Sequence, residues 1–385
     1  MEELLKQKLD AVFQNYEETA ETKDLYQEVY GNLLDATQAH KSDGLSDQEA
    51  SEQAFFEMGD LREVLDEMAQ EKNQTNLAKE SLRQGNTQLS LANEVIFKSA
   101  DFSQISLNNQ TDELEISTAK DGKIHLKEYM NTQNPAFFAN TIENGAELKI
   151  ESGQRPKLFG LPRPFRAKML LLLPENFQGK LSVQAMTGNL KIYQLRIAEL
   201  AFDCRSGNLT MTDSEFSQLQ MKLTSGNAKL ENLITEKLDF EAKSGNVKVQ
   251  QLIAEEADFT FKSGNITFDD SHFKKVKMQL HSGNLKMIKS FALLAQLQAH
   301  SGNIYGEITG FSLLEVGSDN GNIKLYVGNT DSFAFELRSD TGMTKCSCSD
   351  SSYEVKTQGY KIGQVGGNTE NILKAWSKRG NVTVK

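Results

Sequence analysis

The chain has 385 residues, of which 38% are hydrophobic and 25% are charged, with a formal net charge of −11. This length allows about two or three domains, and no apolar run is long enough to predict a membrane-spanning helix. The acidic first residues lack the basic start and apolar segment of a signal peptide, so we expect a cytoplasmic protein. Three cysteines are too few for a disulfide framework and lack the spacing of a zinc site.

Residues 1–69 predict a small helical module. Apolar residues recur there at helical spacing, as at Leu5 and Leu9. Ser46 and Glu49 have the spacing of a capping box, which predicts the start of a helix. A similar start signal predicts a short fourth helix over residues 60–68.

Charge is unevenly distributed along the chain. Residues 1–72 contain nineteen Asp or Glu and six Lys or Arg, a net charge of −13, and the remaining residues sum to +2. The acidic run is either the solvated face of a helical bundle or a docking surface for a cationic partner, such as cationic peptides. Residues 70–93 are polar and indicate a connector between this module and a β-strand-repeat domain over residues 94–385.

The β-strand-repeat domain is indicated by a Gly-Asn pair that recurs at intervals of 19 residues. The eight glycines of these pairs are Gly188, Gly207, Gly226, Gly245, Gly264, Gly283, Gly302 and Gly321. Each unit contains two runs of alternating apolar residues, which is typical of half-buried strands. Two short strands cannot bury their apolar faces alone, so the units must stack. The sequence therefore predicts a mainly β fold: a β-solenoid of 19-residue, two-strand coils over about residues 181–330, with a C-terminal cap over 331–385, preceded by the small α-helical module.

The repeated tripeptide Ser-Gly-Asn has the composition of a tight corner. Glycine permits the positive φ that such a corner needs, and asparagine tolerates left-handed geometry. Equivalent asparagines of stacked coils are expected to form an amide ladder. We interpret the eight glycines as structural turns.

Two columns of outward residues flank the predicted corner. The residues two before and three after each glycine alternate away from the apolar positions, so we expect them to face water. They place eight Lys or Arg and two His along one edge: Lys191, Arg205, Lys229, Lys243, Lys248, Lys262, His281, Lys286, His300 and Lys324. These residues form the candidate edge for binding an anion or a partner.

Two interpretations of this edge stay open. Lysines on a β edge solubilise a protein and block aggregation. A row of like charges also suits an anionic partner. The candidate partners are an anionic polymer, a membrane surface and the protein's own acidic module, and nucleic acid is not expected.

We predict no catalytic, metal or cofactor site. The repeated serines have no adjacent base to activate them as nucleophiles. His281 and His300, one coil apart, supply only two of the ligands that a metal site needs. A β-helix enzyme acting on carbohydrate needs clustered carboxylates, whereas the outward acids here are scattered over different columns.

Parts of the sequence resemble a known family. The Ser-Gly-Asn repeat, the preceding Leu172-Leu173-Pro174 and the closing Lys378-Arg379-Gly380-Asn381-Val382 resemble the bacterial putative-adhesin β-strand-repeat family over about residues 94–385. The run Gly44-Leu45-Ser46-Asp47-Gln48-Glu49-Ala50, followed by Gly59-Asp60-Leu61, is similar to the helical module placed before such domains in Gram-positive bacteria.

The combination is similar to proteins of the Lia cell-envelope stress response. The resemblance implies that the helical part senses cationic antimicrobial peptides and that the β part restrains signalling through a membrane signalling protein. It also implies association with the cell envelope or surface. We therefore expect a non-catalytic binding or regulatory protein of that response. The alternatives are an adhesin-like structural surface protein and, less favoured, a β-helix carbohydrate-active enzyme.

Overall fold

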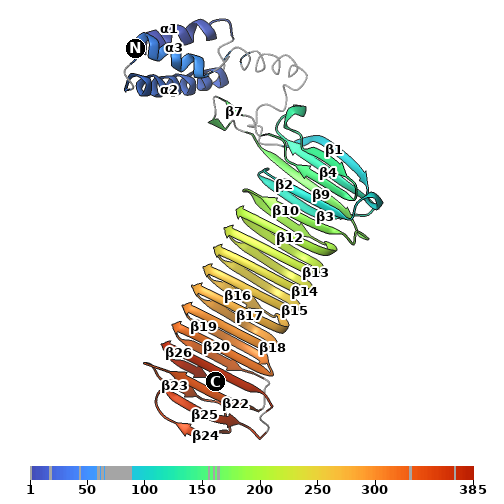
Figure 1. Ribbon diagram of the computed structural model, residues 1–385, viewed down its shortest axis with the longest axis vertical. Helices are drawn as coiled ribbons and strands as arrows, with labels where there is room; N and C mark the ends of the chain where they lie inside the picture. The colour runs from blue at the N-terminus through green and yellow to red at the C-terminus, as the bar shows by residue number, and fades with distance from the viewer. Residues whose placement is uncertain are drawn as a thin grey trace. The chain divides into compact units, whose positions relative to one another are not determined.

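The computed structural model describes residues 2–16, 20–42, 45–58, 61, 65, 89–154, 157–158, 161–162, 165–328, 332–367 and 370–385. The chain divides into two units, one comprising Met1–Gln88 and Pro156–Pro164 and the other Leu89–Arg155 and Phe165–Lys385. The first contains the helices and the second contains nearly all the strands (Figure 1).

The helical unit contains α1 (Glu2–Phe13), α2 (Ala20–Ser42) and α3 (Asp47–Met58), together with a small hairpin of β7 (Lys157–Leu158) and β8 (Leu161–Pro162). The helices enclose an apolar core that includes Leu5, Leu9 and Leu33. The predicted fourth helix, 60–68, lies outside the described residues except for Leu61 and Leu65, which are buried in this core. None of the described helices combines the length and the apolar character needed to cross a membrane.

The predicted capping box is present at the start of α3. The backbone N–H of Glu49 donates to Ser46 Oγ at 3.4 Å, and the Ser46 N–H donates to Glu49 Oε2 at 3.1 Å. These reciprocal bonds satisfy backbone groups that the helix leaves unpaired. The Ser46 hydroxyl, which donates to Glu49 Oε2 at 2.7 Å, and then the Ser46 N–H lower the pKa of Glu49.

The β unit is built of many short and long strands. Before the regular repeat lie β1 (Ser90–Lys98), β2 (Gln104–Asn109), β3 (Glu113–Ala119), β4 (Lys123–Met130), β5 (Asn140–Asn144), β6 (Glu147–Glu151) and β9 (Ala167–Pro174). The stack then contains β10 (Lys180–Ala185), β11 (Asn189–Tyr193), β12 (Arg196–Ser206), β13 (Asn208–Ser225), β14 (Ala228–Ser244), β15 (Val247–Ser263), β16 (Ile266–Asp269), β17 (His272–Ser282), β18 (Leu285–Ser301), β19 (Ile304–Gly310), β20 (Leu313–Asn320) and β21 (Ile323–Val327). The C-terminal strands are β22 (Phe333–Ser339), β23 (Thr344–Cys346), β24 (Ser351–Lys356), β25 (Tyr360–Val365), β26 (Ile372–Arg379) and β27 (Val382–Val384). Because β1 begins at Ser90, the β unit starts earlier than the predicted boundary at residue 94.

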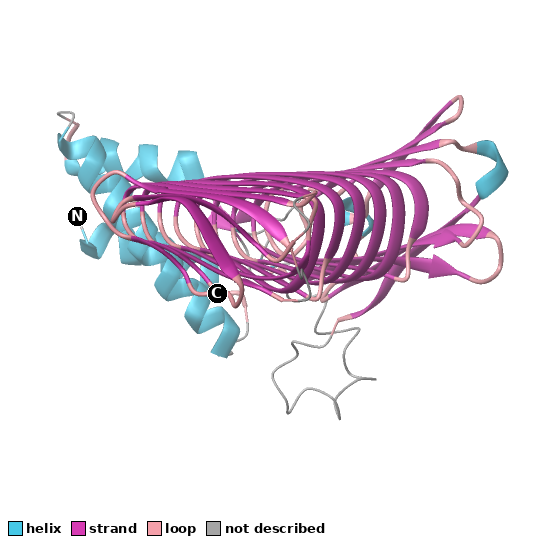
Figure 2. Ribbon diagram, turned by 90° about the horizontal axis from the view of Figure 1, so that it is seen from below, coloured by secondary structure: helices cyan, strands magenta, loops and turns pink. Residues whose placement is uncertain are grey.

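The central strands wind into a β-solenoid-like stack. From β13 to β14 and from β14 to β15, the paired residues are parallel and 19 positions apart, as in Leu219↔Leu238. Successive coils therefore lie in register, and Figure 2, seen along the stack, shows strands on two sides of a common interior. Phe240, Phe259 and Phe268 fill part of this interior, with a tilted ring contact between the first two and an edge-on contact between the last two.

Two features of the Gly-Asn corners favour glycine. From Gly188 to Gly302 the glycines have φ between 109° and 145°, a region that L side chains rarely adopt. Gly321 lies outside this region of φ, so the expected positive φ is absent there. A Cβ on Gly245 would lie 1.6 Å from the carbonyl oxygen of Gly226, and one on Gly321 would lie 1.9 Å from that of Gly302. The glycines are therefore needed mainly because consecutive corners lie in contact.

The expected asparagine ladder is present along these corners. Asn208 Nδ2 donates to Asn189 Oδ1 at 3.3 Å, and such amide bonds recur along the corners to Asn322. The exception is Asn246, whose backbone N–H donates to Asn227 Oδ1 at 3.2 Å. Asn381 extends the ladder, since its backbone N–H donates to Asn322 Oδ1 at 2.8 Å. The ladder ties neighbouring corners together.

A second corner, which the sequence analysis missed, lies six residues after each glycine from Gly188 to Gly283. Non-glycine residues there have φ between 47° and 54°: Gln194, Asp213, Asn232, Gln251, Asp270 and Lys289. In three coils a buried serine follows; Ser290 Oγ, for example, donates to the Ile288 carbonyl at 2.9 Å. Asp and Asn tolerate this conformation, so their recurrence at Asp213, Asn232 and Asp270 was the sequence signal that could have predicted this corner.

The stack extends beyond the predicted range of 181–330 at both ends. β2 and β3 pair in parallel with β10 and β11. At the other end β26 and β27 pair with β20 and β21, although 59 residues separate the paired positions. β22 and β23 then pair with the far side of β26 and β27, so the later strands lie between two earlier ones (Figure 1).

Candidate functional site

A groove of about 760 Å³ lies on the outward face of the stack, where strands lead into the Ser-Gly-Asn corners. Its outward lining residues stand four and two positions before five of the corner glycines. We call the first set the middle row and the second the corner row. The middle row is Thr260, Gln279, Gln298, Gly317 and Trp376, and the corner row is Lys262, His281, His300, Asp319 and Lys378.

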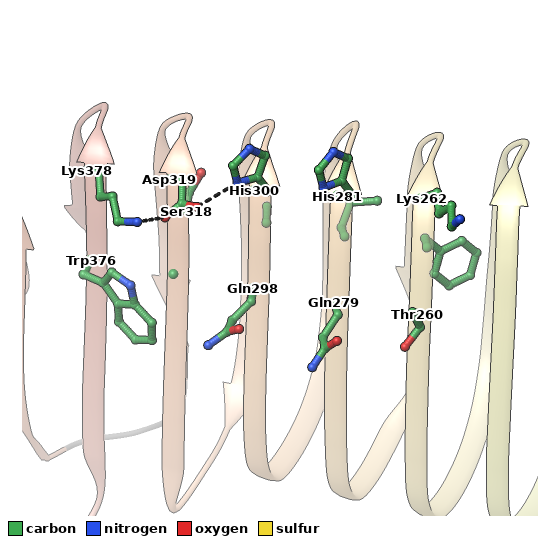
Figure 3. Close-up of a pocket in the computed structure, with 14 residues that line it drawn as sticks. Thr260, Lys262, Gln279, His281, Gln298, His300, Ser318, Asp319, Trp376 and Lys378 are labelled. Carbon is green, nitrogen blue, oxygen red and sulfur yellow. Dashed lines mark hydrogen bonds and ion pairs between the residues drawn. The ribbon is translucent and has the colours of Figure 1, made fainter.

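Parallel pairing aligns both rows across β15, β17, β18, β20 and β26. Gln279 pairs with Gln298, Gln298 with Gly317, and Gly317 with Trp376. Neighbouring side chains in a row are therefore about one strand spacing, ~4.8 Å, apart. Figure 3 shows the two rows running side by side across the strands.

The corner row contains a connected set of charged and polar side chains. The rings of His281 and His300 stack with centroids 4.8 Å apart and an interplanar angle of 8°. His300 Nδ1 lies 2.8 Å from Asp319 Oδ2, and Lys378 Nζ lies 2.7 Å from Asp319 Oδ1 (Figure 3). The Lys378 ammonium, followed by His300, lowers the pKa of Asp319, so this carboxylate is ionised and neutralised in place.

The middle row ends on Trp376, the chain's one tryptophan. Its indole occupies the space in which a side chain at position 317 would stand, because a Cβ on Gly317 would lie 2.4 Å from the indole Cε2 and Cζ2. Trp376 is half-buried and points outward, since its neighbours Ala375 and Ser377 are the buried residues of β26. The groove thus combines an aromatic surface with amides and charges.

All ten residues of the predicted basic edge are exposed. Only Lys262, His281 and His300 line the groove. No residue of the predicted column three positions after the glycines takes part in it. The groove also includes Trp376 and Lys378. These residues stand four and two positions before Gly380, so they continue the two rows into the coil that ends at the Gly380-Asn381 corner.

Carboxylates and aromatic rings interrupt the rest of the predicted edge. Lys191 Nζ lies 2.7 Å from Glu113 Oε1, which raises the pKa of Lys191, and Lys229 pairs with Glu231. Lys286 and Lys324 lie over the rings of Tyr305 and Tyr326 at 5.5 and 5.0 Å. In the part of the chain that the structure describes, Arg205, Lys243 and Lys248 have no ion pair.

Among the described residues, no three His, Cys, Asp or Glu side chains are grouped so that they could hold a metal ion. The three cysteines are free, and Cys204 and Cys346 are buried. The groove can bind a ligand through an indole, two amides and cationic side chains.

A comparison with known protein families identifies one match. The profile of the family described as Toastrack DUF4097 matches residues 102–241 and 213–385. No curated protein matches the chain.

Solved structures match the chain at low identity. They include a putative adhesin from Parabacteroides merdae ATCC 43184 (14% identity, 78% of this chain and 98% of that chain, TM-score 0.40). A putative adhesin from Parabacteroides distasonis ATCC 8503 (15% identity, TM-score 0.38) and a putative lipid binding protein from the same organism (13% identity, TM-score 0.38) cover the same shares.

Proposed function

The chain belongs to the Toastrack DUF4097 family, and from this premise we propose that it is a non-catalytic, adhesin-like binding protein whose groove holds an anionic polymer. The observation that supports the proposal is the alignment of the corner row. Lys262 and Lys378 stand at its two ends, and Asp319, which is paired with Lys378, is the one carboxylate of the row. The row therefore presents positive charge to a ligand that crosses several coils.

Reversing charge at the two ends of the groove tests this proposal. Lys262→Glu/Lys378→Glu in the full chain should lower the affinity for polyphosphate, a simple polyanion, by about tenfold or more at low salt, as measured by fluorescence anisotropy. Lys243→Glu/Lys248→Glu makes the same charge change outside the groove and should lower the affinity by less than about threefold. Equal losses in both variants would contradict a binding site in the groove.

A second candidate function belongs to the helical unit. Its exposed acids, such as Glu2, Asp10 and Glu52, favour docking of cationic peptides. In a cell-envelope stress-response protein, peptide binding here would be transmitted to a protein partner. Replacing Glu2, Glu3 and Asp10 by their amides in the full chain should weaken binding of a lysine-rich peptide, and added salt should weaken it further. Unchanged peptide affinity would remove this candidate.

A further inference from the structure

The position of Trp376 is the feature of the groove that binding of a simple polyanion leaves unexplained. Its indole takes the place of a side chain on Gly317, and any residue larger than glycine there would displace it. The ring lies on the outward face, apart from the apolar interior of the stack, and it is only half-buried. An aromatic ring in this position presents an apolar surface to whatever enters the groove.

The two amides beside the ring are available to a ligand. Gln279 and Gln298 are exposed and stand on successive strands next to Gly317. Among the described residues, no hydrogen bond connects Gln279 to another side chain, and Gln298 likewise has none. Each amide offers two N–H donors and one carbonyl acceptor, which match the hydroxyl groups of a sugar.

The cations of the corner row lie parallel to this surface. Lys262 and Lys378 are four strand spacings apart, about 19 Å. His281 stacks on His300 between them. An extended sugar chain with a carboxylate on each ring would meet several of these side chains in turn, and each contact would be a charge-assisted hydrogen bond.

We infer that the ligand of the groove is an acidic polysaccharide that lies across the coils, with one sugar ring against Trp376, hydroxyl groups on Gln279 and Gln298, and carboxylates beside Lys262 and Lys378. The inference rests on the proposed binding function of the same groove. A sugar ring has apolar C–H faces that pack on an indole, whereas polyphosphate has none. The aromatic ring and the amides therefore favour an acidic sugar over a bare polyanion.

Short oligogalacturonates are a suitable probe, with neutral malto-oligosaccharides of the same length as the uncharged control. Isothermal titration of the full chain should show binding of the acidic sugars only. Trp376→Ala should weaken it by about tenfold or more, whereas polyphosphate affinity should change by less than about twofold. Trp376→Phe keeps an aromatic ring and should retain most of the affinity.

Gly317→Ala tests the placement of the indole without removing it. The added Cβ should displace the ring and weaken oligogalacturonate binding to a similar degree. Gly328→Ala is the matched control, because a Cβ there meets nothing within 4 Å. Gln279→Ala/Gln298→Ala changes only exposed side chains, so it should fold and still lose affinity.

Each outcome separates this inference from the proposed function. Oligogalacturonate binding that survives Trp376→Ala, or an equal loss of polyphosphate binding in that variant, would overturn the polysaccharide assignment. If oligogalacturonates do not bind while polyphosphate binding still depends on Lys262 and Lys378, the assignment fails and the proposed function stands. Trp376-dependent binding of phosphatidylglycerol vesicles without sugar binding would assign the groove to a lipid surface instead.

Discussion

The left-handed residues of the second corner carry a local conformational cost. Lys289 is exposed and has φ of 47°, a conformation that costs a non-glycine residue about 1 kcal/mol. Lys289→Gly should therefore raise the free energy of unfolding by about 0.5–1 kcal/mol in chemical denaturation. Lys286→Gly, in the extended part of the same strand, is the control and should lower it. A loss of stability in both variants would contradict the predicted relief of strain.

Glu128 makes stability depend on pH. It is buried on β4, where its carboxylate accepts hydrogen bonds from Asn93 Nδ2 at 2.8 Å and the Ala139 N–H at 2.9 Å. Burial nevertheless raises its pKa, so the folded state binds the proton more tightly than the unfolded state. This contribution to stability is fully present below the unfolded pKa of about 4.3, and it is lost as the pH rises through the folded pKa.

Comparing Glu128→Gln with the unaltered chain isolates this effect. Between about pH 4 and pH 7 the Tm of the unaltered chain should fall relative to that of the variant, because only the unaltered chain must ionise a buried carboxyl group. Thermal unfolding across this range measures the difference. Parallel Tm profiles would mean that Glu128 does not titrate differently on folding.

At the scale of the coil, the close contact of neighbouring corners predicts a severe response to a single methyl group. In Gly245→Ala the Cβ would lie 1.6 Å from the Gly226 carbonyl oxygen, so the two coils would have to separate. We expect a loss of about 3 kcal/mol or more in the free energy of unfolding. Gly328→Ala should change it by less than about 0.5 kcal/mol. A mild effect at Gly245 would show that corners can part without breaking the stack.

The elements that could be predicted from the sequence are those whose pattern is local and repeated. Alternating apolar residues and the recurring Gly-Asn pair identify a strand-rich, solenoid-like unit after a small helical part. The corner at Gln251 or Lys289 could not be predicted, because long side chains give little sign of a left-handed backbone. That conformation is imposed by the strands on either side.

The candidate site shows the same limit. His281, His300 and Lys262 were expected outside, since they share a column of the repeat. The sequence could not place Trp376 beside Gly317. The paired residues of β20 and β26 are 59 positions apart, and the 19-residue repeat does not predict that pairing. The groove therefore depends on a long-range pairing, which sequence periodicity does not encode.

At the scale of the whole β unit, β26 connects the repeat to the C-terminal strands, because it pairs with β20 on one side and with β22 on the other. Ala375 is buried and pairs with both Val316 and Leu337. Ala375→Asp would bury an unpaired charge and should cost about 3–5 kcal/mol, releasing β22 to β25 to limited proteolysis. Lys374→Gln, next to it, breaks only the exposed pair with Glu315 (3.6 Å) and should cost less than about 1 kcal/mol. Equal protease resistance of both variants would contradict this role.

The inserted strands also set an order of events during protein synthesis. Coils up to β21 can add one after another as they leave the ribosome, since each needs only its predecessor. β22 and β23 are made before the strands on which they pack, so they must wait until residues 372–384 have been synthesised. The surface that carries Trp376 is then completed late, after the rest of the stack has formed.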